Sequence, residues 1–420
     1  MSLQTAEILS VGSEVDQGEV VNTNAALVAR ELFQLGLTIR RHTVVGDDVE
    51  EIAGALREGS ARSDVIVMTG GLGPTSVDLT REGAAMSANV PLIMHPECLE
   101  QIRSYFEGKL HRGTMPEENK RQALMPEGSE VLVNDWGTAP GFHMTLNGCE
   151  IFALPGVPRE CEAMLRCRVL PWLRARMEAG ISLVRTLRTF GMAESAIDTL
   201  LKPKILALKN PTLALYAKSG EIELRMTAKA STAQEASGML DALEAEVRQT
   251  LGDIVYGRDV SSMEEVIVPL LKEKNLMLCT AESCTGGLIA KRITDIPGAS
   301  LVFKGGIVSY SNEAKENLLG VPHAALEQYG AVSPQTAQAM AQGARKVLNS
   351  DLAVSATGLA GPETDEFGHT GGTVFLSLTD GEQTWTREIE SGTDRARVRT
   401  MAAHTALDMV RRYLTGAKIA

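Results

Sequence analysis

The feature that most constrains the fold is an alternation of short apolar runs with helical patterns from Ala6 to about Trp172. The runs AEILSVG and DVIVMTGG have the composition of buried strands, whereas NTNAALVARELFQLG and DDVEEIAGALREGS repeat apolar residues at helical spacing. Strands that alternate with helices form a parallel sheet with helices on both faces. We therefore predict a doubly wound α/β sheet, extended by an antiparallel hairpin that turns at Asn147 and Gly148.

The length of the chain indicates more than one domain, because 420 residues exceed what a single hydrophobic core commonly supports. The middle of the chain combines short strands with polar-faced helices, as in a small α+β module. The alternation of strands and helices returns after GRDVSSMEE. We expect α/β domains at residues 1–175 and 258–420, joined by an α+β module at residues 176–257.

Charge and composition exclude several classes of function. A net charge of −12 repels a polyanion, and aromatic residues make up only 4% of the chain, so we expect no nucleic-acid binding. No apolar run approaches the roughly 18 residues of a membrane span, and the first residues lack a signal-peptide pattern. The six cysteines form no CxxC pair, which is typical of free thiols in a reducing compartment. We expect a cytoplasmic protein that binds no membrane.

A glycine-rich loop follows the buried strand DVIVMTGG. The segment MTGGLGPTSVDLT places Gly70, Gly71 and Gly73 after that strand, with Thr75 and Asp78 at the expected start of a helix. Backbone N–H groups in such a loop can hold a phosphate, and the N-terminus of a helix adds positive partial charge. Asp78 can bind a metal ion or a ribose hydroxyl. Alternatively, the glycines only permit a tight turn and Asp78 caps the helix.

Other loops of the first domain should lie beside this one. The segment VGSEVDQGEVVNTN contains Glu14 and Asn24, and VGDD contains Asp47. Because these residues follow predicted strands, we expect them at one edge of the sheet, where open α/β sheets bind ligands.

Together with GGLGPT, NDWGTAPGF and LPGVP, these segments resemble the molybdopterin-binding-like domain of the CinA family (competence/damage-inducible protein A). The resemblance implies a site for a nucleotide such as ADP-ribose. Some members of the family are also pyrophosphatases that use a divalent metal ion. The resemblance implies this as a candidate second activity here, with Asp78 as the candidate ligand of the metal. Val77 stands where the family commonly has an acid.

The segment TAESCTGGLIAKRIT places small polar and thiol side chains where a predicted strand passes into a helix. Ser283 is a candidate nucleophile there, because N–H groups at the start of a helix can stabilise an oxyanion. Cys284 is the rival nucleophile, since thiolates at helix N-termini are activated. A histidine base has no recognisable position, but Lys315 in GGIVSYSNEAKENLLG can accept the proton if burial lowers its pKa. The alternative is a lysine on an exposed helix face.

The segments TAESCTGG, GGIVSYSNEAK, SATGLAGP, GGTVFLSL and TDRARVRTMAAHTAL resemble, in this order, the C-terminal domain of CinA, the nicotinamide mononucleotide (NMN) deamidase. The resemblance implies that Ser283 is the nucleophile, Lys315 its base and Tyr310 a further catalytic residue. The residues that it implies in substrate binding are Thr285, Gly286, Gly287, Asn312, Thr357, Gly358, Gly361 and Arg395. Arg395 would pair with the phosphate, and deamidation would need no cofactor.

The leading prediction is an amidohydrolase that converts NMN to nicotinic acid mononucleotide and ammonia, with an N-terminal domain that binds and in some members cleaves ADP-ribose. One alternative is a nucleotide-binding regulatory protein with a silent deamidase site. Another is a competence or recombination partner, which the family name suggests and the acidic sequence disfavours. The family and the middle module also suggest a homodimer.

Overall fold

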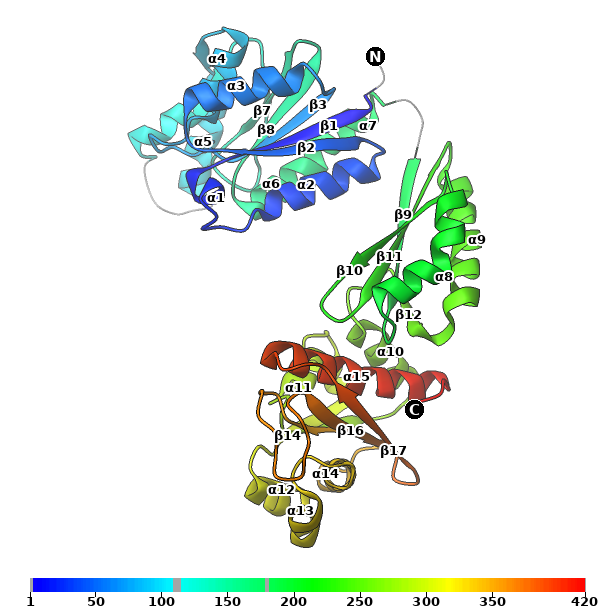
Figure 1. Cartoon of the computed structure of the whole chain (residues 1–420). Coiled ribbons are helices and arrows are strands. Elements are labelled where there is room, and N and C mark those ends of the chain that lie inside the picture. The colour runs from blue at the N-terminus through cyan, green and yellow to red at the C-terminus, as the bar shows by residue number, and fades with distance from the viewer. Residues whose placement is uncertain (1–2, 109–114, 178–180, 420) are drawn as a thin grey trace. The chain divides into compact units, whose positions relative to one another are not determined.

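The computed structural model describes residues 3–108, 115–177 and 181–419 (Figure 1). The chain divides into two compact units. The first consists of Met1–Leu183 with Ala228–Ser237, and the second of Val184–Thr227 with Gly238–Ala420. Within the described ranges, no helix combines the length and the apolar character needed to cross a bilayer.

The first unit is built on a six-stranded sheet in the order β2-β1-β3-β8-β7-β6. Its strands are β1 Thr5–Val11, β2 Thr38–Val45, β3 Val65–Thr69, β6 Glu130–Leu132, β7 Gly141–Leu146 and β8 Cys149–Leu154. The first four strands in this order are parallel, and β7 and β6 are antiparallel additions. The predicted hairpin is confirmed, because Asn147 and Gly148 both adopt positive φ between β7 and β8.

Helices cover both faces of this sheet. They are α1 Ser13–Asp16, α2 Thr23–Gln34, α3 Val49–Ser60, α4 Thr80–Ala88, α5 Pro96–Gly108, α6 Pro158–Met164 and α7 Leu170–Arg174. A short two-stranded sheet pairs β4 Leu92–Met94 with β5 Leu124–Pro126. Val67 of β3 belongs to one hydrophobic cluster with α2, whereas the next residue, Met68, belongs to another with α3. Successive side chains of β3 therefore pack on opposite faces, as a doubly wound sheet requires.

The second unit contains a five-stranded sheet and most of a four-stranded one (Figure 1). The smaller sheet, in the order β10-β11-β9-β12, comprises β9 Ile181–Thr189, β10 Thr212–Ala217, β11 Ile222–Ala230 and β12 Val255–Arg258, with α8 Glu194–Ala207 and α9 Ala233–Leu251. The larger sheet, in the order β14-β13-β15-β16-β17, comprises β13 Leu278–Glu282, β14 Phe303–Val308, β15 Leu352–Gly358, β16 Thr373–Thr379 and β17 Thr384–Glu390. The predicted α/β class is confirmed.

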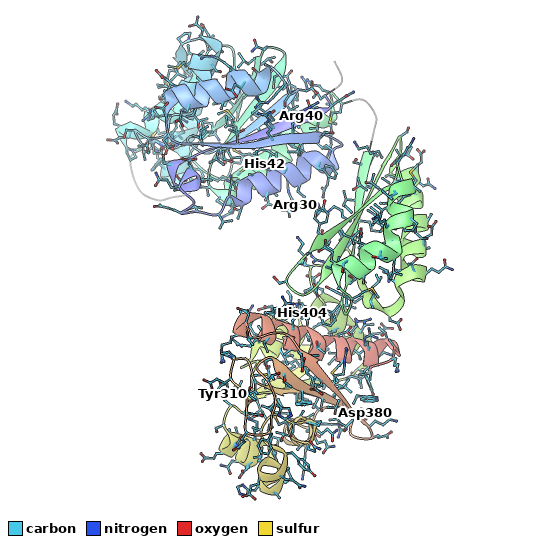
Figure 2. The ribbon with its side chains drawn as sticks, viewed as in Figure 1. Arg30, Arg40, His42, Tyr310, Asp380 and His404 are labelled. Carbon is cyan, nitrogen blue, oxygen red and sulfur yellow. The ribbon has the colours of Figure 1, made fainter. Side chains whose placement is uncertain are left out.

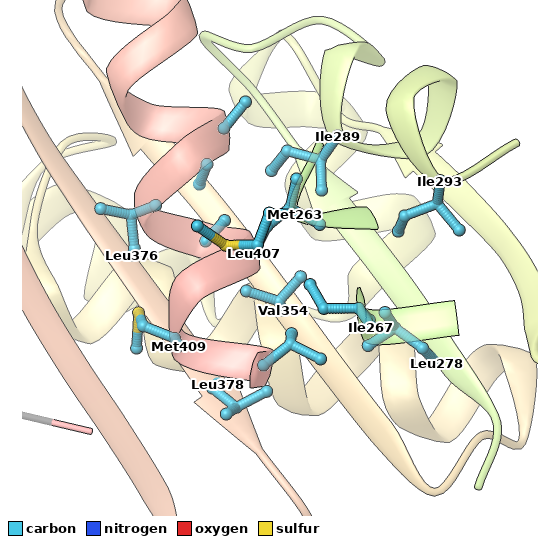
Figure 3. Packing of buried hydrophobic residues seen from close by; sticks show 14 of the residues in the cluster. Met263, Ile267, Leu278, Ile289, Ile293, Val354, Leu376, Leu378, Leu407 and Met409 are labelled. Atoms are coloured by element: carbon cyan, nitrogen blue, oxygen red, sulfur yellow. The ribbon is translucent and has the colours of Figure 1, made fainter. Parts of the chain in front are cut away.

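Helices also cover both faces of the larger sheet. They are α10 Glu264–Lys274, α11 Leu288–Thr294, α12 Asn312–Leu319, α13 His323–Tyr329, α14 Pro334–Leu348 and α15 Arg395–Thr415. Figure 3 shows the core on one face, where Ile267 of α10 and Leu407 of α15 surround Val354 of β15. On the other face, Met340 of α14 packs with Ala353 of the same strand. β13 is parallel to β14 and to β15, so the ends of these three strands and the loops that follow them lie together.

Candidate functional site

A buried serine–lysine pair lies at the carboxyl ends of β13 and β14. Ser283 directly follows β13, and Lys315 lies on α12, whose N-cap Ser311 is three residues after the end of β14. The Lys315 Nζ is 3.2 Å from the Ser283 Oγ. The same Nζ donates to the carbonyl oxygens of Ser309 and Tyr310, at 3.1 and 3.4 Å. The fold therefore brings together the two predicted residues, although 31 residues separate them in the sequence.

Lys315 has an unusual environment for a lysine. The residue is 1% exposed, and none of the ion pairs among the described residues involves it. Burial lowers the pKa of Lys315 because its charged form loses solvation. The alternative of a lysine on an exposed helix face is wrong. A lysine with a lowered pKa can lose its proton and then accept one from a neighbouring hydroxyl.

A cavity of about 170 Å³ opens on this pair. It is lined by Ser283, Cys284, Tyr310, Lys315, Ala331, Val332, Thr357, Gly358, Ala360 and Arg395. These include the predicted catalytic residues and three of the predicted binding residues. The other predicted binding residues do not line the cavity: Thr285, Gly286, Gly287, Asn312 and Gly361. No motif in the sequence indicated Ala331 or Val332, and Ala360 lies in SATGLAGP but was not singled out, because an apolar wall depends on packing rather than on a local pattern.

The rim of the cavity carries a cation and a phenol. Arg395, at the first position of α15, is exposed, and its guanidinium donates to the Tyr310 hydroxyl at 3.2 Å. Tyr310 is 63% exposed at the surface of the second unit (Figure 2). A cation at the N-terminus of a helix is unfavourably placed unless it faces an anion. Arg395 is therefore suited to pair with an anionic group of a ligand in this cavity.

The turn after Ser283 differs from the prediction. The helix does not begin beside the serine: α11 starts at Leu288, after Gly286 and Gly287, which both adopt positive φ. The N–H groups of Ile289 and Ala290 donate to the carboxylate of Glu282, at 3.0 and 2.8 Å. The strand-to-helix pattern predicted that N–H groups at the start of the helix stabilise an oxyanion. The N–H groups of Ile289 and Ala290 are not available for this role, because they bind Glu282.

Cys284 is poorly suited to be the nucleophile. The residue is 5% exposed, and burial raises the pKa of its thiol to about 12. Thiolates are the reactive form of cysteine, and this thiol remains protonated at neutral pH. Of the two rival residues, the geometry favours Ser283.

A second cavity, of about 480 Å³, lies in the first unit beyond the carboxyl ends of β1, β3 and β8. The predicted residues that line it are Glu14, Asn24, Asp47, Gly70, Gly71, Gly73 and Asp78. Thr75 does not line it, and Gln122, which no motif indicated, does. The glycine loop lies close to β1, because a Cβ atom at Gly70 would stand 2.0 Å from the carbonyl oxygen of Val11. Only glycine permits this approach.

Two aspartates of this cavity accept hydrogen bonds from the protein itself. Asp78 accepts the N–H of Gly73 at 2.8 Å, the N–H of Thr75 at 2.8 Å and the Thr75 hydroxyl at 2.5 Å. Asp47 accepts the N–H and the hydroxyl of Ser13. Asp78 caps a loop rather than a helix, since α4 begins at Thr80 with Leu79 as its N-cap, and the interpretation of Asp78 as a helix cap is therefore wrong.

The donor set does not fit a divalent metal ion. A hard cation needs several oxygen ligands around one point. In the part of the chain that the structure describes, no three His, Cys, Asp or Glu side chains gather as a metal site would require. Both carboxylate oxygens of Asp78 are also engaged by the loop. The predicted role of Asp78 as a metal ligand therefore has no support in this geometry.

Comparison with known proteins gives the family. A CinA-like protein of Dictyoglomus turgidum is 43% identical over 410 residues, which cover 97% of this chain and 98% of the relative. The chain belongs to the CinA family. A putative competence-damage inducible protein of Caldanaerobacter subterraneus is 42% identical over 414 residues, which cover 98% of this chain and 99% of that protein. Residues 7–175 match a probable molybdopterin binding domain, 184–257 the damage-inducible protein CinA KH domain, and 260–414 the CinA C-terminal domain.

Solved structures of CinA proteins match parts of the chain. A CinA protein of unknown function from Thermoplasma acidophilum is 35% identical, with a TM-score of 0.38, and the match covers 40% of this chain and 98% of that one. A competence/damage inducible protein from Agrobacterium tumefaciens is 38% identical, with a TM-score of 0.35, and the match covers 36% of this chain and 93% of that one.

Alkylation of the native protein tests the environment of the cysteines. We expect iodoacetamide at mildly alkaline pH to modify Cys167, which is exposed, and to leave Cys284 unmodified because its thiol is buried and protonated. Peptide mass spectrometry reads both sites, and the same reaction after denaturation is the control that must label both. Modification of Cys284 in the folded protein at a rate near that of Cys167 would restore it as a candidate nucleophile.

Proposed function

We propose that this CinA protein hydrolyses the carboxamide of NMN to nicotinic acid mononucleotide and ammonia. The observation that carries the proposal is the 3.2 Å contact between the Ser283 hydroxyl and the amino group of a buried lysine that has no acidic partner among the described residues. This contact supplies a nucleophile and a base in one cavity. The resemblance of the second unit to the CinA deamidase supplies the substrate.

The reaction would proceed by acyl transfer through Ser283. The Ser283 oxygen attacks the amide carbon, and its proton passes to the neutral Lys315 amine. When the tetrahedral intermediate collapses, Lys315 returns that proton to the amide nitrogen, which leaves as ammonia. The remaining acyl ester on Ser283 is cleaved by a water molecule that gives its proton to Lys315. Lys315 then returns the proton to Ser283, and the carboxylic acid is released.

The shape and charge of the site agree with this substrate. The cavity at Ser283 has room for a carboxamide-bearing ring, and its walls of Ala331, Val332 and Ala360 are apolar. The guanidinium of Arg395 at the rim provides paired N–H donors for a phosphate. The alternative, a regulatory protein with a silent site, gives no reason for a lysine to be buried at a cost in solvation beside a serine.

We further propose that the first unit binds ADP-ribose as a ligand. Its cavity lies where open α/β sheets bind nucleotides, and Gly70, Gly71 and Gly73 bring backbone close to that space. Val77 lines the same cavity with 58% of its surface exposed, which suits an apolar part of the ligand. Because the carboxylates of Asp47 and Asp78 are engaged by the protein, the proposal is for binding and includes no metal-dependent cleavage.

Replacement of Ser283 tests the deamidase. We expect the purified chain to release ammonia from NMN, and Ser283→Ala to lower kcat by roughly 10³-fold or more, because no nucleophile remains. Lys315→Ala should be similarly inactive, since the pair acts as a unit. Cys284→Ala is the matched control and should keep most of the activity. If the Cys284 variant is the inactive one, or if the wild type releases no ammonia, the proposal is wrong.

The pH dependence of kcat/KM tests the role of Lys315. Its pKa is lowered from 10.5 by burial, and it must be neutral to accept the serine proton. The neutral fraction grows as pH rises, so kcat/KM should increase with pH and level off below 10.5. A series of initial rates over this range, with enzyme stability checked at each pH, gives the midpoint. A midpoint at or above that of an ordinary lysine would contradict the assignment.

Calorimetric titration with ADP-ribose tests the first unit. We expect binding of equal affinity with EDTA and with magnesium, because the site lacks the ligands for a metal. Asp78→Ala should weaken binding about tenfold, equivalent to about 1.4 kcal/mol, since the loop loses its bonds to the carboxylate. Asp16→Ala is the control, because Asp16 is exposed on α1 and does not line the cavity. Binding that appears only with magnesium would refute the metal-free site.

A further inference from the structure

A buried carboxylate immediately precedes the proposed nucleophile. Glu282 is the last residue of β13 and is 1% exposed. Its Oε2 accepts the N–H of Ile289 at 3.0 Å, and its Oε1 accepts the N–H of Ala290 at 2.8 Å and the hydroxyl of Thr280 at 3.2 Å. None of the ion pairs among the described residues includes Glu282. Its charge is therefore balanced by peptide N–H groups at the start of α11 rather than by a cation.

These bonds close a ring around the turn that holds the nucleophile. The chain leaves β13 at Ser283, turns through Gly286 and Gly287 with φ of 57° and 88°, and enters α11. The N–H groups of the second and third residues of this helix donate to the Glu282 carboxylate. The reactive serine thus lies between the two ends of a side-chain bridge. Within the turn, the N–H of Gly286 donates to Ser283 at 3.1 Å and the N–H of Leu288 to Thr285 at 3.2 Å, and the bridge adds a bond to each end of a segment that two glycines make flexible.

The backbone on each side of Ser283 is also fixed to a neighbouring strand. The carbonyl oxygen of Glu282 accepts the N–H of Ser309 at 2.9 Å, beyond the end of β14, and the N–H of Ser283 donates to Ala356 of β15 at 2.9 Å. The strands therefore hold the peptide before the serine, but they do not hold the residues after it. On the outer side of the turn, Arg399 of α15 donates to the carbonyl oxygen of Thr285 at 2.8 Å.

We propose that Glu282 is a positioning residue for the Ser283–Lys315 pair. Its carboxylate draws the start of α11 back onto the end of β13 and so keeps the Ser283 hydroxyl within reach of the Lys315 amine. Glu282 does not line the cavity, and both of its oxygens are engaged, so it is not a proton donor or acceptor in the reaction. The kinetic part of this inference rests on the proposed deamidase function.

Glu264 offers a matched control for a purely structural role. It is 3% exposed, and its carboxylate binds the guanidinium of Arg292 through two contacts. Arg292 lies in the last turn of α11, so Glu264 holds the same short helix at its other end. Both carboxylates therefore stabilise α11, but only Glu282 binds its N-terminal end, which follows the turn that contains Ser283.

The experiment compares Glu282→Ala, Glu282→Gln and Glu264→Gln in the full chain by NMN kinetics and thermal unfolding. We expect Glu282→Ala to lower kcat about 100-fold with KM changed only a few-fold, because a small displacement of a reacting group has this effect. Glu282→Gln keeps one carbonyl acceptor and should recover part of the loss. Glu264→Gln should lower the unfolding temperature comparably and leave kcat within about twofold.

Hydrogen exchange of the peptide that contains residues 284–290 provides a readout that does not depend on activity. Hydrogen exchange should be faster than in the wild type in both Glu282 variants and unchanged in Glu264→Gln. If Glu282→Ala does not fold, Glu282→Gln replaces it in this comparison. A wild type that releases no ammonia refutes the deamidase, and exchange still decides whether Glu282 holds the turn. Wild-type kcat in Glu282→Ala, or equal loss of kcat in the Glu264 variant, overturns the positioning role.

Discussion

The contact between the Lys315 amine and the Ser283 hydroxyl is the constraint on which the second unit depends. A lysine buried without an acid loses solvation, and carbonyl oxygens of Ser309 and Tyr310 replace only part of it. The sheet must therefore hold these carbonyls, the serine and the lysine in one place. The parallel pairing of β13 with β14 does this, since residues after both strands then lie at the same edge.

The same burial connects stability with chemistry. In water, solvation stabilises the charged ammonium form of a lysine, which keeps its proton. Burial of Lys315 lowers its pKa and favours the neutral amine, which can act as a base. The free energy lost in this way has to be offset by packing elsewhere. The cluster around Ile267, Val354 and Leu407 buries apolar side chains on one face of the sheet, and Met340 and Ala353 do so on the other.

Local patterns predicted the elements and the motifs, but not the partners of individual side chains. Apolar runs such as AEILSVG and DVIVMTGG predicted strands that the structure contains as β1 and β3. The distance between Ser283 and Lys315 depends on tertiary pairing, so spacing alone left an exposed lysine open. The short α13 was not predicted, and the helix after Asp78 begins one residue later than its capping pattern suggested, because the Asp78 carboxylate binds the loop.

An acidic side chain holds a loop beside each of the two cavities in the same way. Asp78 accepts N–H groups of Gly73 and Thr75, and Glu282 accepts those of Ile289 and Ala290. An acid beside a glycine-rich loop invites the interpretation of a catalyst or a metal ligand, yet a carboxylate whose oxygens are filled by peptide N–H groups has little capacity left for either. Such an acid fixes the loop in place, and the proposed chemistry of the second unit is left to the Ser283 hydroxyl on this loop and the Lys315 amine on α12.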